Sequence, residues 1–187
     1  MNWTAVVPMK AFDEAKTRLS CDLSVDARVA LAREMFHHVT AVLNAHPWVS
    51  RLVVVSQSKI PGFAGEWFKE AGRGLNPALE AARDAFGMPL AIFHADLPLL
   101  TVEDVSALLD AGARSGVAIA PDRHDRGTNA IAVYHALHFP FRFGKDSCSR
   151  HLIQCRSAPS VVRTTGLGHD CDTMEDLGSF LRATAAS

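Results

Sequence analysis

Two acidic segments carry the side chains best suited to bind a metal ion. Asp96 follows the short apolar run 89–93, which predicts a buried strand, and Leu97-Pro98 then ends that strand. Asp170 and Asp172 lie just before the last predicted helix. Carboxylates that are distant in sequence but converge on a cleft suit Mg²⁺, which needs only one or two of them together with substrate phosphates. The two segments therefore predict a Mg²⁺ site.

Asp96 also has a purely structural interpretation. An Asp-x-Pro sequence at a strand end is typical of a residue that caps a turn, and the stretch read alone favours that interpretation. In an open α/β sheet, however, ligands bind beyond the carboxyl ends of the strands. The choice depends on whether other charged segments reach the same edge of the sheet.

A basic segment directly follows the first predicted strand, residues 3–7. Lys10, Lys16 and Arg18 would place positive charge at the mouth of the sheet, where a phosphate group can bind. The segment contains no glycine and is not a P-loop, and a solvated basic loop explains it equally well. With the carboxylates, it predicts a nucleoside-triphosphate site in which a metal ion neutralises charge at the α-phosphate.

Predicted strands and helices alternate along the chain. Apolar runs predict strands at 3–7, 51–56, 89–93, 116–120, 130–134 and 160–164. Helices are predicted from Ser24, at 63–71, from Asn76, at 101–114, at 145–155 and from Thr173. Such alternation is typical of one parallel or mixed sheet with helices on both faces, that is, a three-layer α/β fold.

Two of the predicted helix starts are further candidate binding sites. Asn76 suits a helix cap and Pro77 the first helical residue. Capping alone explains both residues, but the Asn76 amide could also hold a nucleotide base. Ser147, with Lys145 beside it, begins a helix whose N-terminus is a natural anion site. An ordinary Ser or Asp cap explains those residues as well.

Length and composition predict one soluble domain over residues 1–187. The chain has a mass of 20.2 kDa, a net charge of -1 and a pI near 6.7, so no global field would recruit nucleic acid or an anionic membrane. Its 4 cysteines show no Cys-x-x-Cys spacing, and we see no secretory leader. No apolar run is long enough to span a bilayer. Reduced thiols and a cytoplasmic location are expected.

Six stretches of the chain resemble the CofC/FbiD guanylyltransferases of coenzyme F420 biosynthesis, which have the MobA-like nucleotidyltransferase fold. They are VVPMKAFDEAKTRLS at 6–20, GLNPAL at 74–79, HADLPLL at 94–100, PDRHDRGTNAI at 121–131, FRFGKDSCSRH at 141–151 and DCDTMEDL at 170–177. The resemblance implies a single Rossmann-like domain with a mostly parallel mixed sheet, of the nucleotide-diphospho-sugar transferase type. It also implies transfer of GMP from GTP to 2-phospho-L-lactate, phosphoenolpyruvate or 3-phospho-D-glycerate, with release of pyrophosphate.

The resemblance further implies a role for individual residues. Mg²⁺ would be bound by Asp96 and Asp172, with Asp170 as a neighbouring partner. Catalysis would involve Asp96 and the residues that bind the triphosphate, which are Lys10, Lys16 and Arg18. Guanine would lie against Gly74, Leu75 and Asn76. The phospho-acid would bind at Thr128, Gly144, Lys145 and Ser147.

The chain departs from the family pattern at two positions. Arg126 stands where the family usually has the first Gly of Gly-Gly-Thr-Asn, and Lys145 where it commonly has Pro. Both changes add positive charge near the expected acceptor pocket, and they could suit 3-phospho-D-glycerate.

Two alternatives stay open. A molybdenum-cofactor-type nucleotidyltransferase is expected to have Leu-Ala-Gly-Gly where this chain has PMKAF at 8–12. A catalytically inactive nucleotide-binding module would have no need to retain three acidic positions. The expected partners are GTP and the phospho-acid. A homo-oligomer and contact with the downstream F420 transferase stay open.

Overall fold

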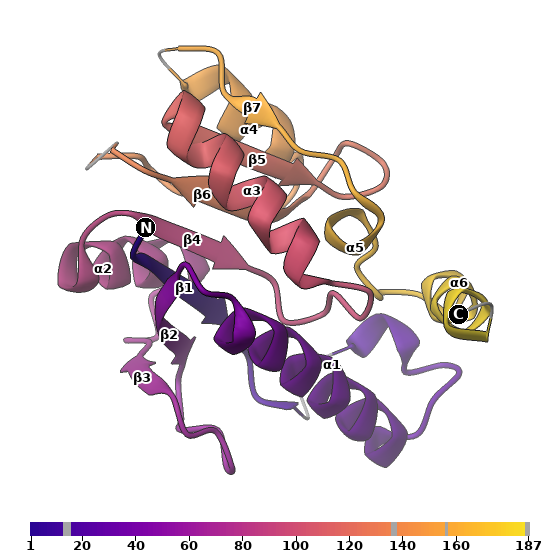
Figure 1. Ribbon diagram of the computed structural model, residues 1–187. Helices are drawn as coiled ribbons and strands as arrows, with labels where there is room; N and C mark the ends of the chain where they lie inside the picture. The colour runs from indigo at the N-terminus through magenta and orange to yellow at the C-terminus, as the bar shows by residue number, and fades with distance from the viewer. Residues whose placement is uncertain (13–15, 136–137, 156, 186–187) are drawn as a thin grey trace.

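The computed structural model describes residues 1–12, 16–135, 138–155 and 157–185, except for the side chains of Arg18 and 181–185. Within these ranges the strands form one seven-stranded sheet in the order β3-β2-β1-β4-β6-β5-β7 (Figure 1). The strands are β1 (Trp3–Pro8), β2 (Val49–Ser56), β3 (Glu66–Lys69), β4 (Leu90–Phe93), β5 (Val117–Pro121), β6 (Thr128–Val133) and β7 (Ser160–Val161). The helices are the 3₁₀-helix η2 (Thr17–Leu19), α1 (Val25–Ala45), α2 (Leu75–Phe86), α3 (Val102–Ser115), α4 (Ser147–Gln154), α5 (Thr165–Gly168) and α6 (Met174–Ala185).

Helices cover both faces of the sheet. Side chains alternate along each strand, so Ala5 and Val7 of β1 pack in one core with α1 and α3, whereas Val6 packs in a second core with α2 and the segment 139–143. This arrangement confirms the predicted three-layer α/β fold.

Strand direction brings several chain segments to one edge of the sheet. β1 pairs in parallel with both β2 and β4, so these strands end at the same edge. β6 runs antiparallel to β4, with Phe93 opposite Ala130, and its first residue Thr128 therefore lies at that edge too. From β1 the chain adds β2 and β3 on one side of the sheet and then crosses to add β4 on the other side. Open α/β sheets bind ligands at such a change of direction, here at the ends of β1 and its two neighbours.

The predicted helix at 63–71 is wrong. Residues Glu66–Lys69 form β3, which pairs in parallel with the outer side of β2. The aromatic pair at its centre explains the preference for a strand: the Trp67 indole donates to Ser56 Oγ at 3.0 Å, while Phe68 packs against Phe86. The last strand, β7, is also shorter than the predicted 160–164.

The helix starts agree with the sequence at Ser24, Thr101 and Thr173 and differ at Asn76. Ser24 caps α1, and Thr101 and Asp104 form the predicted capping box at α3. The predicted Asn76 cap is wrong, because Gly74, at φ +93°, is the N-cap of α2. Glycine adopts this backbone conformation at low cost, whereas asparagine pays more. Among the described residues, no helix has the length and apolar character needed to cross a membrane.

We expect Asp104→Ala to lower the free energy of unfolding by about 1–2 kcal/mol, because the buried Asp104 carboxylate accepts from both the backbone N–H and the hydroxyl of Thr101 at 2.9 Å. Asp110→Ala on the same helix is the control, since its partner Arg114 is exposed and such pairs contribute little. Urea denaturation of both variants tests this. Equal losses would contradict a special role for the capping box.

Candidate active site

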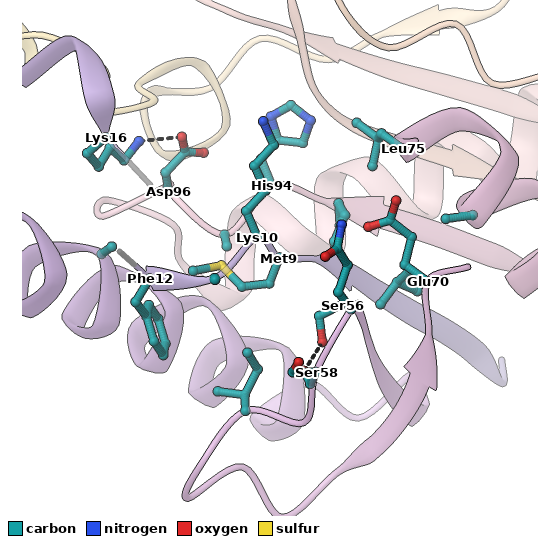
Figure 2. Close-up of a pocket in the computed structure, with 18 of the residues that line it drawn as sticks. Met9, Lys10, Phe12, Lys16, Ser56, Ser58, Glu70, Leu75, His94 and Asp96 are labelled. Atoms are coloured by element: carbon teal, nitrogen blue, oxygen red, sulfur yellow. Dashed lines mark hydrogen bonds and ion pairs between the residues drawn. The ribbon is translucent and has the colours of Figure 1, made fainter. Parts of the chain in front are cut away.

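A cleft of about 990 Å³ opens at the edge where β1, β2 and β4 end. Its volume is at the upper end of the usual range for small-molecule sites. Figure 2 shows residues from the end of β1, the ends of β2 and β3, and the segment after β4 facing this space. The cleft therefore lies at the strand-order reversal, as predicted for a ligand site.

Lys16 joins Asp96 and Asp172 at one end of the cleft. Its ammonium group lies 2.5 Å from Asp96 Oδ2 and 3.0 Å from Asp172 Oδ1. The Lys16 side chain is only 5% exposed, whereas those of Asp96 and Asp172 are 23% and 37% exposed. The structure thus brings together three of the predicted site residues from three distant parts of the chain.

The electrostatics of this cluster follow from its geometry. Burial opposes the charge on Lys16, but the two carboxylates outweigh it and raise the pKa of the amine. Burial likewise opposes ionisation of Asp96, but Lys16 and, next, His94 hold the pKa of this carboxyl below its usual value. Lys16 and Asp96 are therefore both charged at neutral pH. Asp96 Oδ1 is buried and has no hydrogen-bond partner among the described residues.

The other basic residues of the predicted triphosphate loop differ in position. Lys10 is exposed and lines the cleft. The side chain of Arg18 lies outside the described part of the chain. Lys16 itself has a left-handed backbone with φ +56°, a conformation that costs a non-glycine residue about 1–3 kcal/mol. Its ion pairs offset that cost.

Asp170 lies beside the ion cluster. Its Oδ1 accepts from Asn129 Nδ2 at 3.2 Å, and the next residue, Cys171, donates its backbone N–H to the Asp96 carbonyl at 3.1 Å. Burial and the negative charge of Asp96 raise the pKa of Asp170. Unlike Asp172, Asp170 does not line the cleft.

The residues predicted to hold guanine separate into two groups. Gly74 and Leu75 line the end of the cleft away from Lys16, and Leu75 is an exposed apolar side chain there (Figure 2). The Asn76 amide instead donates to the Phe143 carbonyl at 3.1 Å and accepts from the Phe143 N–H at 2.8 Å. In this structure Asn76 therefore fixes the neighbouring wall of the cleft.

The residues predicted to bind the phospho-acid lie at and behind that wall. Gly144 lines the cleft and Lys145 beside it is exposed. Thr128 and Ser147 are buried, with exposures of 1% and 2%. The Ser147 backbone N–H donates to the Gly144 carbonyl at 3.1 Å, which ties the start of α4 to the cleft wall.

A buried histidine organises this region. His151 is fully buried, and its Nε2 accepts from the Arg142 backbone N–H at 2.9 Å. Burial, followed by the nearby His94, Arg142 and Arg150, lowers the pKa of His151 to about 4, so the ring is neutral at pH 7. A neutral ring whose Nε2 accepts must carry its proton on Nδ1. That N–H then donates to the Thr128 hydroxyl oxygen at 3.0 Å.

Several polar residues at the cleft were missed by the sequence reasoning, among them Ser56, Glu70 and His94. Each stands at or directly after a strand end, which is the signal that could have found them. For Glu70 the predicted helix at 63–71 hides this signal. Glu70 Oε1 accepts from the Gly74 N–H at 3.2 Å, so it also shapes the start of α2.

Solved structures with the same overall fold are similar to this chain. A protein assigned as a nucleotide-diphospho-sugar transferase from Desulfovibrio desulfuricans G20 superposes with a TM-score of 0.78 at 17% identity, covering 99% of this chain and 88% of that one. CMP:2-keto-3-deoxy-manno-octonic acid synthetase in complex with CTP gives a TM-score of 0.64 at 14% identity, covering 100% and 99%. These similarities confirm the fold that the sequence predicted.

Sequence comparison narrows the assignment. Residues 3–183 match the family described as "Guanylyl transferase CofC like". Phosphoenolpyruvate guanylyltransferase of Sphaerobacter thermophilus is 36% identical over 95% of this chain and 91% of its own length. 2-Phospho-L-lactate guanylyltransferase of Methanothermobacter thermautotrophicus is 34% identical over 97% and 85%. The chain belongs to the CofC-like guanylyltransferase family, which confirms the predicted resemblance.

His151 generates a prediction about pH. Because its pKa falls from an unfolded value near 6.5 to about 4, the unfolded state binds a proton that the folded state excludes, and stability falls as the pH drops from 6.5 to 4. Over that pH range the shifted pKa of His151 changes the free energy of unfolding by about 3 kcal/mol. His151→Gln, which retains an acceptor for Arg142, should remove it. Urea denaturation between pH 4.5 and 7.5 measures the difference between variant and wild type, in which other titrating groups cancel. Parallel pH curves would contradict the assignment.

Proposed function

We propose that this protein transfers GMP from GTP to the phosphate of a small phospho-acid, releasing pyrophosphate, as a step in coenzyme F420 biosynthesis. The observation that carries the proposal is the cluster of Lys16, Asp96 and Asp172 at the end of a cleft large enough for a nucleotide. The names of the two relatives support a guanylyl donor and a phospho-acid acceptor. The acceptor is one of phosphoenolpyruvate, 2-phospho-L-lactate and 3-phospho-D-glycerate.

The reaction needs no general base, because a phosphate oxygen of the acceptor is already anionic near neutral pH. This oxygen forms a bond to the α-phosphorus of GTP, and the bond from that phosphorus to the bridging oxygen breaks as pyrophosphate leaves. The protein must align the two reactants and compensate their charge. Three described lysines that line the cleft are placed to do so: Lys10, Lys16 and Lys59.

We infer that Mg²⁺ is the cofactor and that Asp96 and Asp172 bind it. The buried, unpartnered Asp96 Oδ1 fits a ligand position, and both carboxylates already face a cation in the form of the Lys16 ammonium. The described residues contain no group of three or more His, Cys, Asp or Glu side chains arranged for a metal. Two carboxylates are enough for Mg²⁺, because this ion is commonly held by one or two carboxylates together with substrate oxygens. When bound, it would neutralise charge on the triphosphate.

A pyrophosphate-release assay tests the proposed function. The protein is incubated with GTP, Mg²⁺ and each of the three phospho-acids in turn, with pyrophosphatase present to produce phosphate. We expect release with at least one acid, loss of release in EDTA and a preference for GTP over CTP. Release with none of the acids would favour the catalytically inactive alternative. A preference for CTP would rule out the guanylyl donor.

Asp96→Asn should lower turnover by about 10²- to 10³-fold, because it removes a charge that acts on the transferring group. It should also weaken Mn²⁺ binding in the presence of GTP, measured by electron paramagnetic resonance with Mn²⁺ in place of Mg²⁺. Asp22→Asn, an exposed carboxylate outside the cleft, is the control and should change neither. A folded Asp96→Asn protein with normal turnover and normal Mn²⁺ binding would exclude the metal role.

A further inference from the structure

His94 has no assigned role, yet it lies at the centre of the cleft. It directly follows β4 and stands two residues before Asp96, and its backbone N–H donates to the Asn129 carbonyl at 2.9 Å. Figure 2 shows its ring projecting from the strand end into the cleft. The side chain is half-buried, so its position is set by the strand edge rather than by a loose surface loop.

The ring of His94 is held in place without using its nitrogens. It packs against Phe143 with the ring centroids 5.3 Å apart. Neither ring nitrogen makes a hydrogen bond to any residue in the described ranges. Other histidine rings are committed to protein partners, including those of His38, His46, His151 and His169. His94 therefore presents donor and acceptor positions that a ligand can use.

The neighbours of His94 place it between the ion cluster of Lys16 and the cleft wall that carries Gly144. It is close enough to Asp96 and to His151 to lower the pKa of both. Asp96 belongs to the ion cluster with Lys16, and His151 holds Thr128 behind the wall that carries Gly144. The imidazole thus lies between the carboxylates and the region expected to receive the phospho-acid.

The proposed reaction requires compensation of negative charge at this position, because it brings two phosphate anions together. Their repulsion opposes the approach of the attacking oxygen to the α-phosphorus. A hydrogen-bond donor fixed between the two groups before the reaction would compensate this charge without reorganisation. Because Phe143 already restrains the ring of His94, little side-chain freedom is lost when a ligand binds.

We propose that His94 is a further catalytic residue, whose imidazole N–H donates a hydrogen bond to the acceptor phosphate and holds its attacking oxygen against the α-phosphorus. The inference rests on the proposed guanylyl transfer and adds to it. The bond from the acceptor oxygen to phosphorus forms while the bond to the pyrophosphate oxygen breaks, and no proton leaves His94.

Two substitutions of similar length separate a hydrogen-bonding role from packing against Phe143. His94→Gln keeps an N–H donor but loses the ring, whereas His94→Met keeps apolar contact with the Phe143 ring but loses the donor. At saturating GTP, we expect His94→Met to lower kcat/KM for the phospho-acid by about 10- to 100-fold. His94→Gln should recover most of that loss. The Kd for GTP, measured by calorimetry, and the melting temperature should change little in either variant.

The opposite order of activities would overturn the proposal. If His94 only packs against Phe143, His94→Met stays active and His94→Gln is impaired. Equal loss in both variants with weakened GTP binding would show a damaged cleft and also reject the specific role. His37→Gln, an exposed histidine on α1, is the control and should behave as wild type. If the wild-type protein releases no pyrophosphate with any of the three acids, the proposed function itself fails. If the wild-type protein is active and His94→Met is equally active, only the proposed role of His94 is rejected.

Discussion

The site depends on one buried ammonium group placed between two carboxylates. Lys16 follows β1, Asp96 follows β4 and Asp172 precedes α6, so a single side chain joins segments that are 80 and 156 residues apart. Without Lys16 the two carboxylates would repel each other, and the segment after β1 would lose its ion pairs to Asp96 and Asp172. The left-handed backbone of Lys16 persists because these ion pairs fix its side chain.

The opposite wall of the cleft is held by hydrogen bonds to the backbone rather than by ion pairs. Residues 139–144 form neither helix nor strand, yet side chains from α2 and α4 satisfy their backbone. The bonds run from Arg83 to the Phe139 carbonyl, from Gln154 to the Pro140 carbonyl, from the Arg142 N–H to His151, and between Asn76 and Phe143. The buried rings of Phe139, Phe141 and Phe143 add apolar packing. An irregular segment is thereby made rigid enough to define one side of a binding site.

Sequence patterns predicted those parts of the structure that depend on local chemistry. The capping box of Thr101 and Asp104 and the buried apolar strands β1, β4 and β5 agree with the predictions because neighbouring residues determine them. The segment 63–71 was misread because its aromatic residues become a strand only through pairing with β2. The role of Asn76 depends on a contact 67 residues away, so its suitability as a cap was misleading. The sequence predicted that Asp96 and Asp172 converge. The position of Lys16 between them is seen only in the structure.

The contacts of Asp96 bear on its two interpretations. A carboxylate that caps a turn accepts hydrogen bonds from backbone N–H groups a few residues ahead. Here the turn after Asp96 is closed by the backbone itself, since the Leu100 N–H donates to the Leu97 carbonyl at 3.2 Å. Asp96 Oδ2 accepts a hydrogen bond from the Lys16 ammonium group, and Oδ1 is buried without a partner among the described residues. Leaving a buried polar atom unsatisfied costs about 1–3 kcal/mol, and proteins retain such costs chiefly at functional sites. Turn formation gives no reason for that cost, whereas the proposed binding of a cation together with a triphosphate would give one.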